Sequence, residues 1–449
     1  MLKVAKTSVL IVLLLTFLSA MACITPRAAP AADFGTQQMP GLGLRPSDSI
    51  DEFDFTVEDD RLLHVAWLVQ LRERPDADEI KVQVWYRQME SAKGRWRDPV
   101  LVTAGGSPPL RILILGDQLH LLIGRELKHF ASNDGGRTWV ELAQVVPTPR
   151  VQTFDAALDG GSIIVAYVAR MRRTFGSQVP ESVGVWTARL TTSGPSAPTR
   201  VGAFPGVSHT EPKLLISSRE VRLFYAVSRI GRGAAPDQVH ANLFESWSSD
   251  HGATWSLPQA IATLGLHDGH ARQSGNGSIS HLDAVRLKNH ILIFYNAAWL
   301  YAAKSRNGTS WSDASTLIGV RSWLGPAQTT SVAAVASGDR GQLIWIDSRF
   351  QHSDRTLLNP WGLPWFLDAD WVDNDVLALP LSLTLRPIEE VTAAKPVRLT
   401  RELSFAARVR AKASGNRVYV MWPGRARVGR HLDSAGKPST IFFRSLPLE

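Results

Sequence analysis

One pattern recurs seven times along the 449-residue chain: an apolar run, a tight turn and a second apolar run. Gly, Asn, Asp and Ser fill most of the turns, because these residues tolerate a positive φ or hydrogen-bond to their own backbone. The following runs are rich in β-branched and aromatic residues, which favour strands. The pattern therefore predicts seven β-hairpins, with turns at residues 58–60, 116–117, 159–161, 217–218, 288–289, 337–339 and 414–416.

Each predicted hairpin is followed by a third apolar run, and often by a fourth run that contains proline. Beyond the N-terminal segment, no long stretch has the helical period. Four antiparallel strands per unit, repeated along one chain, indicate an all-β fold, a β-propeller. Seven hairpins favour seven blades, with six as the alternative. The last unit ends soon after its third strand, so the N-terminal segment is expected to supply the fourth, closing the ring and covering an exposed edge.

A second repeat reads S-x-D-x-G-x-T-W at residues 132–139 and 248–255, with a degenerate copy at 305–311 and a weaker one at 91–96. We expect it to join the third and fourth strands of a blade. The Asp carboxylate and the Ser and Thr hydroxyls can accept backbone N–H bonds within the turn, Gly permits a left-handed residue, and Trp packs beneath. The residues assigned this structural role are Ser132, Asp134, Gly136, Trp139, Ser248, Asp250, Gly252 and Trp255.

The repeated turn resembles the Asp box, or BNR repeat, of the sialidase superfamily. The resemblance covers the repeat organisation of most of the chain and implies a propeller whose Asp boxes lie opposite the active site. It says little about activity, because a fold hosts many functions. The F/Y-R-I-P tetrapeptide of active sialidases does not begin this domain, and the six tyrosines lie in predicted second and third strands. The catalytic residues of the family are therefore not transferred to this chain.

Arginines and acids recur at matching ends of the predicted strands, on the face opposite the Asp boxes. Second strands end near Arg170, Arg229, Arg349 and Arg425, which are candidate substrate-binding residues because guanidinium matches carboxylate or sulfate. The alternative is that they are solvated edge charges. First strands, which line the axis, begin near Asp54, Asp155, Glu211 and Asp283.

Glycoside hydrolysis usually needs paired carboxylates, which makes Glu211 and Asp283 candidate catalytic residues. The alternative is that these acids bond to neighbouring backbone N–H groups.

Two loops on the same face are unusual in composition. The polar loop 267–281 contains His267 and His270, which are candidate substrate-binding residues but lack the further ligands that a metal site requires. The insertion 350–375 holds Trp361, Trp365, Phe366 and Trp371, which suit stacking on sugar rings or form a small satellite core. We expect no cofactor and no metal.

The N-terminal residues 1–22 have the features of a secretory signal: Lys3 and Lys6, then an apolar run at 8–18, then small residues. The run is short for a membrane span. The only cysteine, Cys23, would follow the cleavage site, and L-S-A-M-A-C resembles the bacterial lipoprotein box except at Ala20. Cys23 is therefore predicted to carry a lipid; plain secretion is the alternative. Residues 23–50 are predicted to be a flexible tether, and residues 51–449 the propeller.

The charge balance limits the partners. Removing Lys3 and Lys6 lowers Lys+Arg from 49 to 47 against 41 Asp+Glu, a net charge of +6. No basic run suits nucleic acid, whereas mild attraction to anionic glycans is reasonable. The sequence predicts an exported propeller in the cell envelope, which contacts the membrane only through a lipid on Cys23. The alternative is a soluble periplasmic or secreted propeller. It would bind or act on glycans, as a divergent exo-glycosidase of sialidase type for acidic sugars or as a noncatalytic glycan-binding or protein-docking module.

Overall fold

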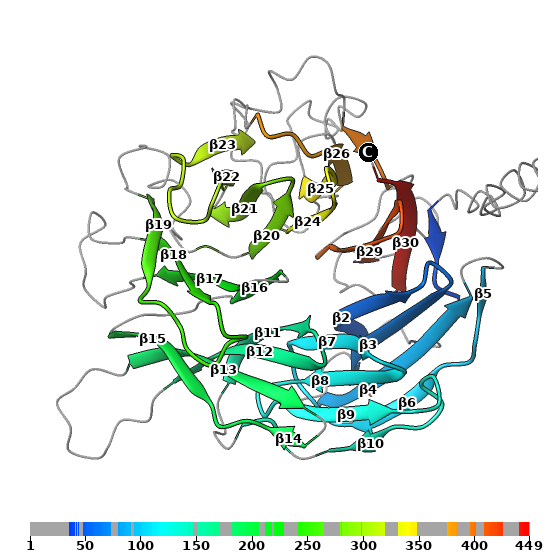
Figure 1. Cartoon of the computed structure of the whole chain (residues 1–449). Coiled ribbons are helices and arrows are strands. Elements are labelled where there is room, and N and C mark those ends of the chain that lie inside the picture. Colours follow the sequence, from blue (N-terminus) through cyan, green and yellow to red (C-terminus); the bar gives the residue numbers. More distant parts are fainter. Residues whose placement is uncertain are drawn as a thin grey trace, which may run out of the picture. The chain divides into compact units, whose positions relative to one another are not determined.

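Successive side chains of a strand point to opposite faces of the sheet, so an apolar run needs cover on both faces. The computed structural model arranges the sheets in a ring, with each sheet between two neighbours (Figure 1). It describes residues 36–40, 42, 44, 48–72, 80–90, 94–142, 144–146, 151–170, 182–191, 193–205, 212–217, 220–228, 241–264, 279, 281–297, 299–318, 331–347, 375–384, 396–400, 408–424 and 440–448. All of them belong to the second of two compact units, Gly35–Glu449. Every regular element in these residues is a β-strand, and none of them forms a helix suited to cross a membrane.

The strands form seven antiparallel sheets, the blades, each built mainly from consecutive strands. Blade 1 contains β2 (Ser49–Glu58), β3 (Leu62–Arg72), β4 (Ile80–Glu90) and an outer strand in two pieces, β5 (Arg95–Trp96) and β6 (Val100–Ala104). Blade 2 contains β7 (Leu110–Leu115), β8 (Gln118–Ile123), β9 (Lys128–Ser132) and β10 (Val140–Glu141). Blade 3 contains β11 (Val151–Asp159), β12 (Ser162–Arg170), β13 (Ser182–Thr191) and a divided outer strand, β14 (Gly194–Pro195) and β15 (Thr199–Pro205).

The remaining blades follow the same plan. Blade 4 contains β16 (Lys213–Ile216), β17 (Val221–Ser228), β18 (Ala241–Ser248) and β19 (Gln259–Leu264). Blade 5 contains β20 (His281–Leu287), β21 (His290–Ala297), β22 (Trp299–Ser305) and β23 (Ser315–Ile318). Blade 6 contains β24 (Val332–Ser337), β25 (Arg340–Asp347), β26 (Asp375–Pro380) and β27 (Val397–Arg398). Blade 7 contains β28 (Arg410–Ser414), β29 (Arg417–Gly424), β30 (Thr440–Pro447) and β1 (Gln37–Gln38).

The seven predicted hairpins are the first two strands of the seven blades, so the propeller and its blade number are confirmed. The first strands contact one another in sequence, β2 to β7, β11, β16, β20, β24 and β28, and β28 returns to β2. The outer strand of blade 7 comes from the N-terminal segment, as predicted: β1 pairs with β30, Gln37 opposite Phe443 and Gln38 opposite Phe442. Antiparallel pairing between the two ends of the chain thus completes the last blade.

Seven apolar clusters fill the seven interfaces between neighbouring blades. In β3, for example, Val65 and Trp67 pack toward blade 7, whereas Ala66 and Leu68 pack toward blade 2. Because side chains alternate along a strand, each sheet buries one face against each neighbour. The core is therefore a ring of interfaces around an axis, and only the inner strands can present polar groups to that axis.

The Asp boxes join the third and fourth strands, as predicted. In the box between β18 and β19, Asp250 Oδ1 accepts hydrogen bonds from Ser248 Oγ (2.7 Å) and Thr254 N (2.9 Å), and Thr254 Oγ1 donates to Asp250 Oδ2. Gly252 has a φ of 85° and donates its N–H to Ser248 Oγ at 2.7 Å. Hydrogen bonds from Ser248 and Thr254 hold the pKa of Asp250 well below its usual range.

The box between β9 and β10 repeats this geometry. Asp134 accepts from Ser132, Arg137 and Thr138, and Gly136 N–H donates to Ser132 Oγ at 2.8 Å. The Trp139 indole donates to the Gly136 carbonyl, as Trp255 does to that of Gly252. Both boxes thus make the same set of hydrogen bonds within the turn.

Each box also rests on the preceding blade. Tyr86 of β4 donates to the carbonyl of Gly135, and its ring lies so close to Gly136 that a Cβ there would overlap it. The Trp255 indole likewise donates to Thr187 Oγ1 of blade 3 at 3.0 Å. The boxes are therefore contacts between blades as well as turns within them.

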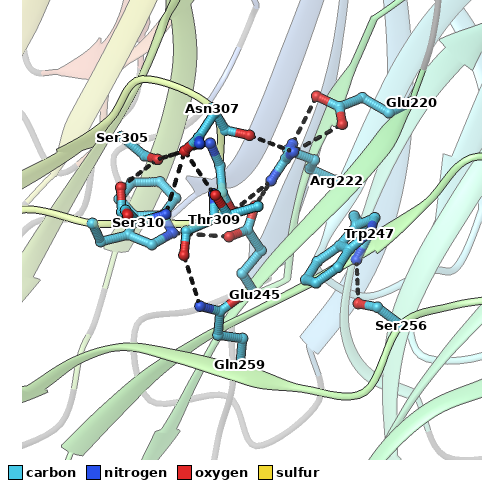
Figure 2. A network of polar contacts seen from close by, with 12 residues as sticks. Glu220, Arg222, Glu245, Trp247, Ser256, Gln259, Ser305, Asn307, Thr309 and Ser310 are labelled. Atoms are coloured by element: carbon cyan, nitrogen blue, oxygen red, sulfur yellow. Dashed lines mark hydrogen bonds and ion pairs between the residues drawn. The ribbon is translucent and has the colours of Figure 1, made fainter.

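The third box has Asn307 in place of the aspartate and meets an ion pair of blade 4 (Figure 2). The Arg222 guanidinium bonds to Glu220 and Glu245, and also donates to the carbonyls of Asn307 (3.2 Å) and Gly308 (3.1 Å). The Glu245 side chain is fully buried and accepts from the Trp311 indole at 2.9 Å. A buried ion pair thus holds the third box, whereas the box at 248–255 also contacts a carboxylate of the preceding blade through His251, which bonds to Asp159 at 2.9 Å.

Candidate functional site

A cavity of about 300 Å³ lies on the axis, and all seven first strands or the residues just before them contribute to its wall. Apolar residues supply most of the lining, but each of six blades adds at least one charged side chain. The charged residues are Asp54, Arg111, Asp155, Lys213, Asp283, Arg410 and Lys412. Four cations and three carboxylates therefore face one small space.

Asp155 is held on both sides by neighbouring blades. Its Oδ1 accepts from Arg111 Nε of blade 2 at 2.9 Å, and its Oδ2 accepts from the Leu214 N–H of blade 4 at 3.0 Å. Burial alone would raise the pKa of this carboxyl, but the positive charges of Lys213 and Arg111 hold the pKa well below its usual range. Asp155 is therefore ionised at neutral pH, and it is no proton donor there.

Asp283, in blade 5, has the same arrangement as Asp155 in blade 3. Its Oδ1 lies 2.8 Å from Lys213 Nζ of blade 4, and its Oδ2 accepts from the Ala334 N–H of blade 6 at 2.8 Å. The charges of Asp283 and Asp155 outweigh the burial of Lys213 and raise its pKa, so Lys213 is a stable cation. Both oxygens of the predicted catalytic carboxylate Asp283 are thus used within the fold.

Asp54 completes the series, because its Oδ2 accepts from the Ile112 N–H of blade 2 at 3.1 Å. The three acids lie in blades 1, 3 and 5, and each bonds to the first strand of the following blade. This arrangement supports the alternative in which the axial acids satisfy backbone N–H groups of neighbouring blades. It also explains why a charge is tolerated on the innermost strands, since every carboxylate has a buried donor.

The cations of blade 7 differ from one another. Arg410 bonds to Glu52 at 3.2 Å, and Arg408 also pairs with this fully buried carboxylate. Lys412, two residues further along β28, is attracted by the charge of Asp54. Burial lowers the pKa of Lys412, and the charges of Lys213 and Arg111 act in the same direction.

The structure places the predicted acids deeper than the strand ends. Asp54 and Asp155 are mid-strand residues of β2 and β11, and Asp283 is the third residue of β20. Arg170 ends β12, as predicted, and lies opposite Val183 in the sheet. The other predicted site residues lie outside the described part of the chain: Glu211, Arg229, Arg349, Arg425, His267, His270 and Cys23. The aromatic residues of the 350–375 insertion also lie outside it.

Sequence reasoning missed the cations Arg111, Lys213, Arg410 and Lys412. The available signal was a basic residue inside or beside an otherwise apolar first strand, as in L-R-I-L-I-L and R-A-K-A-S. Such a charge is costly unless it meets a partner or a polar cavity. Among the described residues, no group of three or more His, Cys, Asp or Glu side chains is placed to hold a metal ion.

Residues 63–322, more than half of the chain, match the model of a family described as the BNR repeat-like domain. The chain belongs to this family. The predicted sialidase-like Asp-box propeller is thereby confirmed in its repeat family and its fold. A comparison with curated proteins finds no match.

Among solved structures, the BNR repeat-like propeller is similar to the polysaccharide lyase Uly1, with 11% identity, 95% of this chain and 94% of that chain covered, and a TM-score of 0.50. It also matches the NanB sialidase from Streptococcus pneumoniae (10% identity, 95% and 72% covered, TM-score 0.43) and an α-L-arabinofuranosidase from Fusarium graminearum (11%, 93% and 98%, 0.41). At these identities the similarity concerns the fold alone.

Proposed function

We propose that this propeller binds glycans that carry a negative group, and that the axial cavity takes part in the binding. The observation that carries the proposal is the charge of the cavity wall, where four cations face three carboxylates. A cationic concave wall attracts and orients an anionic ligand. The structures matched above include a polysaccharide lyase, which is compatible with a carbohydrate ligand.

Binding without turnover is the form of this function that the described residues favour. A glycosidase of the common type needs one carboxylic acid that can give up a proton and a second free carboxylate. Asp155 and Asp283 have both oxygens bonded to cations and backbone N–H groups. Hydrolysis would therefore require carboxyl groups other than these two, such as Glu211.

A glycan screen tests the proposal. The chain without its signal would be applied to acidic glycans and to matched neutral ones, with binding and product release measured separately. We expect binding of acidic glycans that weakens with added salt, and no product. Binding to neutral and acidic glycans alike would contradict the role of charge, and release of sugar would show that the propeller is an enzyme.

We further propose that the protein is exported and held in the cell envelope by a lipid on Cys23. The signal-like residues 1–22 and the cysteine that follows them support this. Changing Cys23→Ser should move the protein from the membrane fraction to the soluble exported fraction. A wild-type protein found wholly in the soluble fraction would contradict the lipid anchor.

A further inference from the structure

Among the residues that the structure describes, Lys412 is the cation of the axial cavity without a close acidic partner. Arg111, Lys213 and Arg410 lie within 2.9, 2.8 and 3.2 Å of the carboxylates of Asp155, Asp283 and Glu52 respectively. Within the described part of the chain, neither a hydrogen bond nor an ion pair engages the Lys412 amino group, and Asp54 acts on it only through its charge. A half-buried ammonium without a direct partner is unfavourable, and a ligand can supply the missing charge.

The surroundings of Lys412 leave space for such a ligand. Blade 6, which adjoins β28, contributes only Ser331, Val332 and Ala333 to the cavity wall, and the neighbour of Lys412 on β28 is Ala411. The cavity volume of about 300 Å³ lies at the lower end of the range for ligand pockets, roughly 300–1,000 Å³. One small unit fits this space better than several residues of a polymer.

The other charges favour an anion. Asp155 and Asp283 are already neutralised by Arg111 and Lys213, and Asp54 accepts the Ile112 N–H. A cationic group beside Lys412 would add to the cost of its charge, because Lys213 and Arg111 already disfavour that charge. An oxyanion would lower that cost and could accept hydrogen bonds from the ammonium.

We propose that Lys412 binds the oxyanion group, a carboxylate or a sulfate, of an acidic sugar in the axial cavity. The identification of the ligand as an acidic sugar rests on the proposed function. Lys412 would then distinguish acidic sugars from neutral ones of the same size.

Thermal unfolding of the mature chain in the presence of sulfate, glucuronate or glucose tests the assignment, with sodium chloride at equal ionic strength as reference. Wild type should be stabilised by glucuronate and sulfate but not by glucose. Sulfate should still stabilise Lys412→Met, but only through its general effect as an excluded salt. Glucuronate should bind this variant at least about thirtyfold more weakly than it binds wild type. Lys412→Arg should restore binding, and Lys128→Met, which removes a surface lysine, should behave as wild type.

The same variants separate ligand binding from a structural role. In chloride alone, Lys412→Met should unfold at the wild-type temperature or above, because it removes a buried charge without a direct partner. A lower unfolding temperature, or equal glucuronate binding in wild type and Lys412→Met, would overturn the inference. If acidic glycans bind regardless of Lys412, the proposed function stands without this site. If glucuronate and sulfate bind through Lys412 but no glycan binds, the oxyanion site stands and the proposed function fails.

Discussion

At the scale of single residues, this propeller depends on side chains whose charge state is set by their neighbours. Asp155 is buried and ionised because Arg111 and the Leu214 N–H face its two oxygens. Two buried histidines of blade 2, His120 and His129, are neutral instead: His120 Nδ1 and His129 Nε2 share a hydrogen bond of 2.9 Å. Acid should therefore act on the two kinds of group in different pH ranges.

Asp155→Asn should lower the free energy of unfolding at pH 7 by about 3–5 kcal/mol, because it leaves the buried Arg111 without its carboxylate. The pKa of Asp155 is lowered in the fold, so its stabilisation is complete above its ordinary value of 3.8 and is lost as the pH falls below that. Urea unfolding between pH 7 and pH 2.5 should show the wild-type advantage shrink in acid. Asp117→Asn, at an exposed residue, is the control. An equal loss of unfolding free energy in that variant would argue against a stabilising Arg111–Asp155 pair.

The histidine pair predicts a loss of stability that begins at a higher pH than the loss due to Asp155. Burial lowers the pKa of His129 to about 4, from 6.5 in the unfolded chain. The unfolded chain therefore takes up the proton first, so stability is complete above pH 6.5 and falls until about pH 4, by roughly 3 kcal/mol. His129→Gln should flatten this part of the profile in urea titrations. A wild-type profile that is already flat from pH 7 to pH 5 would contradict the assignment.

At the scale of elements, the Asp-box turn is a contact between blades whose chemistry varies. Tyr86 holds the first box. Thr187 and Asp159 hold the second, and Arg222 and Glu245 hold the third. The third box has lost the aspartate carboxylate of the motif, since Asn307 stands in its place. Asn307 Oδ1 still accepts N–H bonds within the turn, and the guanidinium of blade 4 adds bonds to the Asn307 and Gly308 carbonyls.

Arg222→Met should cost about 3–5 kcal/mol of unfolding free energy, because the fully buried Glu245 would lose its cation. Adding Glu245→Gln should recover part of the loss, and a double-mutant cycle in urea would measure the coupling. Amide exchange at residues 307–310 should rise in Arg222→Met alone. Arg286→Met, which removes a more exposed partner of Glu220, should cost less than about 1 kcal/mol; an equal cost would mean that burial of Arg222 is unimportant.

At the scale of the whole molecule, stability depends on completing the ring. A two-residue strand, β1, covers the edge of β30, and the next residue, Met39, is fully buried in the cluster between blades 7 and 1. Met39 N–H also donates to the Ile441 carbonyl at 2.8 Å. An uncovered edge strand is a template for pairing with another chain, so the N-terminal strand also limits association.

Met39→Ala should cost about 2–5 kcal/mol and should also free the edge of β30. Met89→Ala removes an equally buried methionine from the same cluster but leaves the edge covered. Both variants should unfold earlier, whereas only Met39→Ala should form oligomers on mild heating, measured by light scattering. Equal association in both variants would show that edge exposure is not the cause.

Local patterns in the sequence predicted the blades. Turn residues between apolar runs specify a hairpin within a few positions, and the S-x-D-x-G-x-T-W turn satisfies its own hydrogen bonds, so both can be recognised from short segments. The closure by the N-terminal segment followed from counting strands.

The tertiary structure alone decided what the axial charges do. By sequence position Asp283 is a candidate catalytic acid and Asp155 another axial carboxylate, yet each bonds to a backbone N–H of the following blade. Arg111 and Lys412 are each a single charge in a strand-like run of the sequence. Closure of the ring brings Arg111 to Asp155, whereas it leaves Lys412 facing the cavity. The physical reason is distance along the chain: these contacts join residues in different blades, 44 and 59 positions apart for Asp155 with Arg111 and Leu214. No local preference of the chain encodes such a pairing, which closure of the ring creates.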